Sequence, residues 1–311
     1  MNGIELARAF WEKEGLPMME RDFPDLLPRV AVGLAGSGSE CLGFDDEISR
    51  DHDFEPGFCL FLPGEDAVSR REEFLLERAY AKLPREFAGF RRSGLSPVGG
   101  NRHGPIRAAL FWTEKLGVPT GVLSPENWLS LPDYALAEAA GGAVFRDDSG
   151  FFTRVRAGLK PPADVVSKKL AAQFFLMGQA GQYNLPRCLA RGEKGAAALA
   201  ADAFVRAALF ARHLLAGVFE PYYKWAFRSL RRLPGGGETE KSLLTVLSVL
   251  TAGPEAQGAV ETVCRETASL ARERDPALPD TAEMEKLAWA QNDRIASEGI
   301  RNLHLLYTVR D

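Results

Sequence analysis

Two aspartates separated by a single residue, Asp51 and Asp53, form the pattern in this sequence with the clearest chemical meaning. Alternate side chains of an extended strand share one face, so we expect both carboxylates to project together while His52 points the other way. Their charges repel unless a cation lies between them, and carboxylate oxygens suit Mg²⁺ or Mn²⁺. The pattern therefore predicts a divalent metal site at Asp51 and Asp53.

A turn rich in glycine and serine precedes the aspartates, with Ser39 twelve residues before Asp51. A dinucleotide-binding turn is disfavoured because Cys41 stands where its third glycine is required. A P-loop is disfavoured because no Lys-Ser or Lys-Thr follows Gly43. Backbone N–H groups and a hydroxyl in a short turn bind phosphate oxygens, so Gly38 and Ser39 are predicted to bind phosphate. Next to a metal site, this predicts a nucleoside triphosphate as ligand.

The elements that must position these residues are short apolar runs separated by Gly, Pro and Asp in residues 28–150. Such runs, rich in Val, Ala, Phe and Leu, are typical of buried strands. We predict strands at residues 29–35 and 58–63, the second continuing from residues 51–54, and a helix within residues 67–82. Residues 106–112 suit a strand that runs into a helix, and residues 143–145 are ambiguous.

The second half of the chain is rich in alanine and has helical spacing. We predict helices at residues 165–180, 195–219, 241–250, 259–272 and 281–307. Three consecutive glycines disfavour a helix, so residues 233–239 are predicted to form a flexible turn. The predicted fold class is α+β. Residues 1–150 are predicted to form an α/β domain with a small mixed sheet, and residues 151–311 are predicted to form an all-α helical bundle.

Composition limits the classes of function. The 311 residues suit about two domains, and a formal charge of −4 disfavours non-specific nucleic-acid binding. The four cysteines lie far apart and suggest neither a zinc site nor a disulfide framework. The most apolar long segment, residues 196–219, contains Asp202, Arg206 and Arg212, so no membrane span is predicted. We expect a cytoplasmic protein.

The turn and the aspartates together resemble the signature of the polymerase-beta-type nucleotidyltransferase superfamily: Gly38-Ser39, a spacer with Gly43, then Ser49 and Asp51-His52-Asp53-Phe54. A resemblance to the domain-of-unknown-function 4037 (DUF4037) branch rests on four segments, residues 50–57, 151–162, 181–192 and 221–230. These proteins are similar to antibiotic nucleotidyltransferases, in which an α/β catalytic domain is joined to a helical bundle that shapes the acceptor pocket. The resemblance implies that residues 1–150 are the nucleotidyltransferase-like catalytic domain and residues 151–311 are the acceptor-binding bundle.

The resemblance implies that Gly38 and Ser39 bind the triphosphate, while Asp51 and Asp53 coordinate Mg²⁺. The implied reaction moves a nucleoside monophosphate from the triphosphate to a hydroxyl of a small molecule or protein. Active members place a third carboxylate on a later strand, yet residues 101–112 contain no Asp or Glu. Glu55 and Glu114 lie near in sequence, and His103 is a candidate base. Two alternatives therefore stay open, a catalytically weakened nucleotide-binding regulator and an antitoxin-like interaction protein.

Lysines and aromatic residues in the second half form the remaining candidates. Tyr223 and Lys224, in the segment Pro221–Trp225, are predicted to contact the triphosphate, because a cation among aromatic side chains is costly to bury without an anion. The alternative is packing by Tyr222 and Trp225 within a bundle helix. Tyr183, Asn184 and Arg187 form a polar set at a helix boundary. Lys168 and Lys169 are expected at the surface, with one as a candidate for the cleft.

Overall fold

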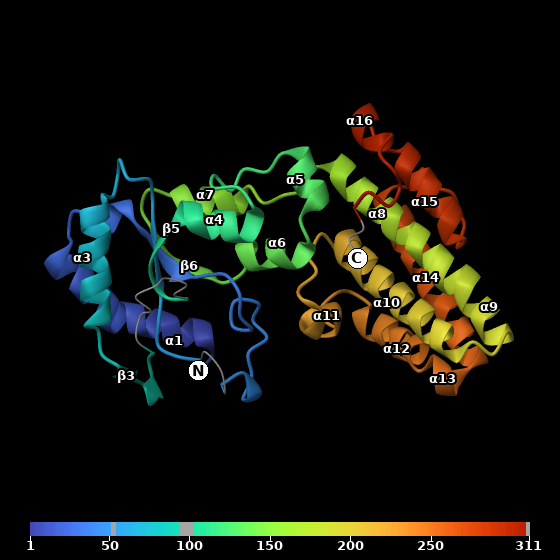
Figure 1. Ribbon diagram of the computed structural model, residues 1–311, viewed down its shortest axis with the longest axis horizontal. Coiled ribbons are helices and arrows are strands. Elements are labelled where there is room, and N and C mark those ends of the chain that lie inside the picture. Colours follow the sequence, from blue (N-terminus) through green and yellow to red (C-terminus); the bar gives the residue numbers. More distant parts are fainter. Residues whose placement is uncertain (51–53, 94–101, 309–311) are drawn as a thin grey trace. The chain divides into compact units, whose positions relative to one another are not determined.

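A computed structural model describes residues 1–50, 54–93 and 102–308 of the chain (Figure 1). The chain divides into two compact units. The first comprises Met1–Asn127 with Leu131–Lys160, and the second comprises Trp128–Ser130 with Pro161–Asp311. The architecture is α+β with a small mixed sheet, as predicted. The assignment of residues 1–150 and 151–311 as catalytic and acceptor domains stays a prediction.

The first unit is built on a four-stranded sheet in the order β5-β2-β1-β6. Its strands are β1 (Ala31–Leu34), β2 (Cys59–Leu62), β5 (Gly104–Arg107) and β6 (Ala143–Asp147). β2 runs parallel to β5, whereas β1 is antiparallel to both β2 and β6. A separate two-stranded ribbon pairs β3 (Glu86–Phe87) with β4 (Phe90–Arg91).

Helices of the first unit fall into an N-terminal and a later group. The N-terminal group is α1 (Gly3–Phe10), the π-helix η1 (Trp11–Gly15), α2 (Leu16–Asp22), the short 3₁₀ turns η2 (Leu27–Arg29) and η3 (Ile48–Arg50), and α3 (Arg70–Ala81). The later group is α4 (Ala108–Leu116), α5 (Pro125–Ser130), which spans the unit boundary, α6 (Asp133–Ala140) and α7 (Phe151–Ala157). Ser69 starts α3 through a capping box with Glu72.

Side chains of β2 alternate between two cores, one on each face of the sheet. Leu60 and Leu62 join a cluster with Phe10, Met19 and Leu76, which come from α1, α2 and α3. On the other face, Phe61 stacks on Phe152 of α7 with ring centroids 3.9 Å apart, and it meets Phe111 of α4 at 5.2 Å. Period-two alternation of large apolar residues therefore covers both faces of this strand.

The second unit is helical. Its elements are α8 (Ala163–Met177), the π-helix η4 (Gly178–Asn184), α9 (Leu185–Ala190), α10 (Lys194–Ala216), α11 (Tyr223–Leu230), α12 (Gly236–Leu247), α13 (Val249–Ala252), α14 (Pro254–Arg274), α15 (Met284–Asp293) and α16 (Glu298–Arg301). Gly217, in the left-handed conformation with φ 68°, ends α10.

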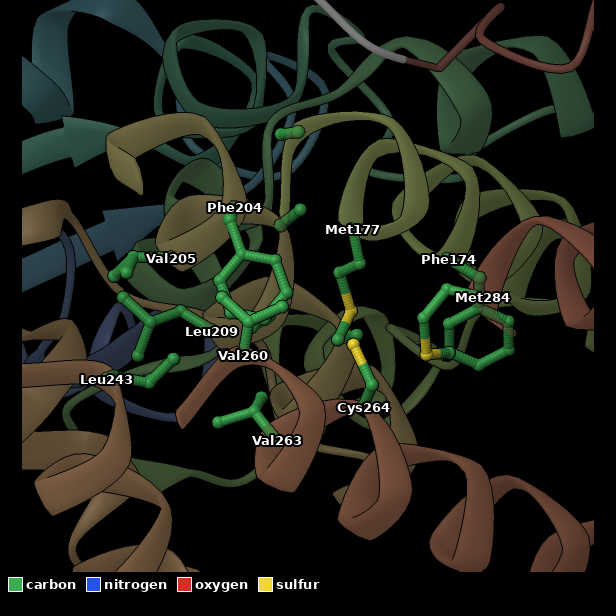
Figure 2. Packing of buried hydrophobic residues seen from close by; sticks show 14 of the residues in the cluster. Phe174, Met177, Phe204, Val205, Leu209, Leu243, Val260, Val263, Cys264 and Met284 are labelled. Atoms are coloured by element: carbon green, nitrogen blue, oxygen red, sulfur yellow. The ribbon is translucent and has the colours of Figure 1, made fainter. Parts of the chain in front are cut away.

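Helices from the early and the late parts of this unit's sequence together form its core (Figure 2). Phe204 and Leu209 of α10 pack with Val260 and Cys264 of α14, and Met284 of α15 approaches Phe174 of α8. Because these apolar faces are buried against one another, the bundle has a continuous core.

Several sequence-based expectations are wrong in detail. α12 begins at Gly236, so two of the three glycines lie in its first turn, where the backbone N–H groups need no intrahelical partner. The strand predicted from residues 51–54 onward begins only at Cys59, and Phe54 is outside any strand. The helix predicted over residues 281–307 is divided into α15 and α16.

Two lysines of α8 that were expected at the surface are buried. Lys168 is fully buried, and its Nζ donates to Asn292 Oδ1 at 2.9 Å and to the carbonyl oxygens of Arg301 at 3.2 Å and Leu303 at 2.7 Å. Burial lowers the pKa of Lys168. Lys169 is buried over the ring of Phe210, with Nζ 5.7 Å from the centroid. Lys168 thus ties the end of the chain to α8.

Candidate functional site

The mixed topology brings several loops to one edge of the sheet. The chain leaves β1 after Leu34 at the edge where it enters β2 at Cys59, because these two strands are antiparallel. It enters β5 at Gly104 at the same edge, because Cys59 pairs with Gly104 in the parallel ladder. The glycine-serine turn, Glu55 and His103 therefore lie at the ends of adjacent strands.

The predicted phosphate-binding turn, residues 36–39, follows β1 directly. Gly36 and Gly38 adopt φ of 113° and 132°, a region that favours glycine. The side chains of Arg102 and Glu40 pair with each other and occupy the space that a Cβ on Gly38 would need. Arg102 Nη2 also donates to the carbonyl oxygen of Ser37 at 2.9 Å. An anion that binds over Gly38 would have to displace the Glu40 carboxylate.

A second cation approaches the same turn from α4. Lys115 Nζ donates to Ser37 Oγ at 2.7 Å and to Glu138 Oε2 of α6 at 2.9 Å, and Ser37 Oγ donates to Glu138 at 2.8 Å. Burial lowers the pKa of Lys115, but its bonds to Glu138 and Glu114 outweigh burial, so the pKa is raised overall. The lysine is therefore a fixed positive charge beside Ser37. Both cations therefore bond to Ser37, Arg102 to its backbone carbonyl oxygen and Lys115 to its hydroxyl.

Glu55 and His103 meet at the same edge. His103 is 6% exposed, and its Nδ1 lies 3.3 Å from Glu55 Oε1, while the backbone N–H of Ser93 donates to Glu55 Oε2 at 2.5 Å. Burial raises the pKa of Glu55, but the hydrogen bonds with His103 and Ser93 lower it by a larger amount, so that the pKa is about 2. Glu55 is thus an ionised carboxylate already engaged by two groups, and His103 faces it.

The proposed metal ligands, Asp51 and Asp53, lie outside the described residues. Within residues 1–50, 54–93 and 102–308, no group of three or more His, Cys, Asp or Glu side chains is placed to hold a metal ion. Coordination of Mg²⁺ or Mn²⁺ by Asp51 and Asp53, whose oxygen donors suit either cation, stays a prediction.

The remaining predicted site residues lie in the second unit. Lys224 is exposed, with Nζ 5.2 Å from the centroid of the Trp225 ring, so the argument that it is buried among aromatic residues is wrong. Tyr223 is 66% exposed and its ring lies 4.4 Å from that of Tyr222. Tyr183 is exposed in η4, and the guanidinium of Arg187 lies over its ring at 4.6 Å. Contact of Tyr223 and Lys224 with a triphosphate stays a prediction.

Comparison with known proteins assigns part of the chain to a family. Residues 128–226 match the family described as Domain of unknown function (DUF4037). That confirms the predicted DUF4037 resemblance for this range, which contains two of the four segments in full. No curated protein and no solved structure matches the chain. No described helix combines the length and the apolar character needed to cross a membrane.

Sequence reasoning did not single out Arg102, Lys115, Glu40 or Glu138. Lys115 and Glu138 read as ordinary polar positions on predicted helical or unassigned segments, far from the turn in sequence. Arg102 stands beside His103, but only the pairing of β5 with β2 brings it to the turn. A local signal for these residues does not exist, because strand order is what assembles them.

Proposed function

We propose that the chain binds a nucleoside triphosphate with Mg²⁺ or Mn²⁺ and transfers the nucleoside monophosphate to a hydroxyl of a small molecule or protein. The observation that carries the proposal is the convergence of Arg102 and Lys115 on Ser37, next to Gly38 and Ser39. Two cations beside a turn of glycine and serine suit the oxygens of a polyphosphate.

In the proposed reaction, the acceptor oxygen forms a bond to the α-phosphorus and the bond to the bridging oxygen of the β-phosphate breaks. Pyrophosphate leaves with the bonding electron pair, and the acceptor proton passes to a base. A cation held by Asp51 and Asp53 would supply charge neutralisation at the phosphates. Arg102 and Lys115 would hold the phosphate oxygens, with Arg102 exchanging its Glu40 partner for one of them.

Calorimetry with each nucleoside triphosphate, with and without Mn²⁺, tests binding. We expect metal-dependent binding that Asp51→Asn/Asp53→Asn abolishes and that Lys115→Met weakens about tenfold or more. Glu40→Gln should tighten binding, because it removes the carboxylate that competes for Arg102. Lys241→Met, an exposed lysine on α12, is the matched control and should leave affinity unchanged. Equal binding by wild type and the double aspartate variant would show that the assignment is wrong.

A second candidate is a nucleotide-binding regulator without turnover. It is favoured by the engagement of Glu55, the carboxylate nearest to Asp53 along the described chain, with His103 and Ser93. Pyrophosphate release distinguishes the two: release with any hydroxyl acceptor supports the transferase, whereas metal-dependent binding without release across an acceptor panel supports the regulator.

A further inference from the structure

A cavity of about 560 Å³ lies in the first unit between the N-terminal helices and α3. Its apolar lining includes Met18, Leu75 and Leu83, of which Met18 and Leu83 are buried in the core on that face of the sheet and Leu75 is exposed. None of the residues around the glycine-serine turn lines it. The volume falls within the range of roughly 300–1,000 Å³ typical of small-molecule sites.

The polar side chains around this cavity are mostly basic. Four basic side chains, Lys13, Arg21, Arg78 and Lys82, and two acidic ones, Glu14 and Asp22, line it. The lining therefore carries a formal charge of +2, whereas the whole chain carries −4. A local positive charge on an acidic protein favours an anionic ligand.

Three of these cations keep their charge available to a ligand. Arg21 pairs with Asp22 through two bonds of 2.7 and 2.8 Å, which neutralises both. By contrast, no carboxylate of the described chain lies within 4.0 Å of the charged nitrogens of Lys13, Arg78 or Lys82. Lys13 and Arg78 instead lie 5.9 and 5.8 Å from the ring centroids of Phe87 and Phe74. The positive charges of Lys13, Arg78 and Lys82 would be stabilised by an anion whose apolar part also covers the apolar lining of the cavity.

The helix that carries Lys13 and Glu14 is irregular at this position. η1 is a π-helix between α1 and α2, and a π-turn in a helix is frequent at functional sites. Gly15 packs so closely against Phe58 and Trp11 that a side chain there would overlap both rings. Lys13 and Glu14, both in this π-helix, line the cavity.

We infer that this cavity binds a small amphiphilic anion, with an apolar chain over Met18, Leu75 and Leu83 and a phosphate or carboxylate head among Lys13, Arg78 and Lys82.

Calorimetry with decyl phosphate below its micelle concentration tests the inference, with decanol and inorganic phosphate as separate arms. We expect one decyl phosphate per chain, bound at least about tenfold more tightly than either partial ligand. Lys82→Glu should weaken the binding of decyl phosphate about tenfold, because it reverses the charge at a head-group contact. Leu75→Asp should weaken binding by a similar factor, because it removes an apolar contact with the decyl chain. Leu75 is 44% exposed, so its replacement should not unfold the protein.

The control is Lys286→Glu, which makes the same change of charge on α15 in the second unit, where the exposed lysine pairs with exposed Glu283. It should bind decyl phosphate as wild type does. Decyl phosphate that binds no more tightly than decanol or phosphate would overturn the inference. So would equal affinity in wild type, Lys82→Glu and Leu75→Asp, because binding would then lie elsewhere.

Discussion

Replacing Glu55 with glutamine should destabilise the protein at neutral pH and leave its stability unchanged in strong acid. The ordinary pKa of this carboxyl is 4.5; burial raises it, but the bonds from His103 and Ser93 bring it to about 2 in the folded state. A carboxyl with that difference contributes at most ~3 kcal/mol to stability at neutral pH. Because the side chain is 18% exposed, solvent screening reduces this, and we expect about 1–2 kcal/mol.

The direction of the pH dependence follows from the different proton affinities of Glu55 in the folded and unfolded states. The folded-state pKa is below the unfolded one, so the contribution is fully present above pH 4.5 and is lost as the pH falls from 4.5 to about 2. Urea unfolding of wild type and Glu55→Gln at pH 7, 5, 4 and 3 measures it. Glu77→Gln, an exposed position on α3, is the control and should show no such dependence. A stability difference that stays constant from pH 7 to pH 3 would refute the reasoning.

Three further predictions concern stability and use urea unfolding as the measurement. Gly181→Ala should lower the free energy of unfolding by about 1–3 kcal/mol, because its Cβ would overlap the Phe204 ring. Gly258→Ala, on the open face of α14, should raise it by about 0.5–1 kcal/mol. Equal effects of the two substitutions would show that the close packing at Gly181 is not real. Lys168→Met should cost about 1–3 kcal/mol, because Asn292 Oδ1 and the carbonyl oxygens of Arg301 and Leu303 each lose a hydrogen bond from Nζ, and unchanged stability would contradict a role in fixing the C-terminal segment. Ser69→Ala should cost about 1 kcal/mol through the lost cap of α3, and a neutral effect would show that the cap is not used.

The elements with a strong periodic pattern could be predicted from the sequence. β1 and β2 lie within the predicted ranges 29–35 and 58–63, and α3 lies within 67–82. The segment 106–112 is indeed a strand that runs into a helix, with the change at Arg107–Ala108. These predictions hold because apolar spacing reflects burial against a sheet or a helix. The start of α12 was missed because glycine tolerates the first turn of a helix, where packing rather than propensity decides.

The lysines show why burial could not be predicted locally. Lys224 was expected to be buried because aromatic residues surround it in sequence, yet it is exposed beside Trp225. Lys168 was expected at the surface, yet it is fully buried, because carbonyl oxygens more than 130 residues away in sequence accept hydrogen bonds from its Nζ. Only tertiary structure supplies such acceptors, and without them a buried ammonium would be prohibitively costly.

The two anion sites proposed for the first unit can be tested independently because the sheet separates their supporting elements. The turn is bonded to Lys115 of α4 and Glu138 of α6, and α4 also packs through Phe111 on the Phe61 face of β2. The cavity is lined by η1, α2 and α3, which pack on the opposite face with Leu60 and Leu62. A substitution such as Lys82→Glu therefore changes charge on one face and leaves the contacts of Ser37 intact. If Lys82→Glu also abolished metal-dependent nucleotide binding, the two sites would have to be coupled through the sheet, and the separation argued from strand alternation would be wrong.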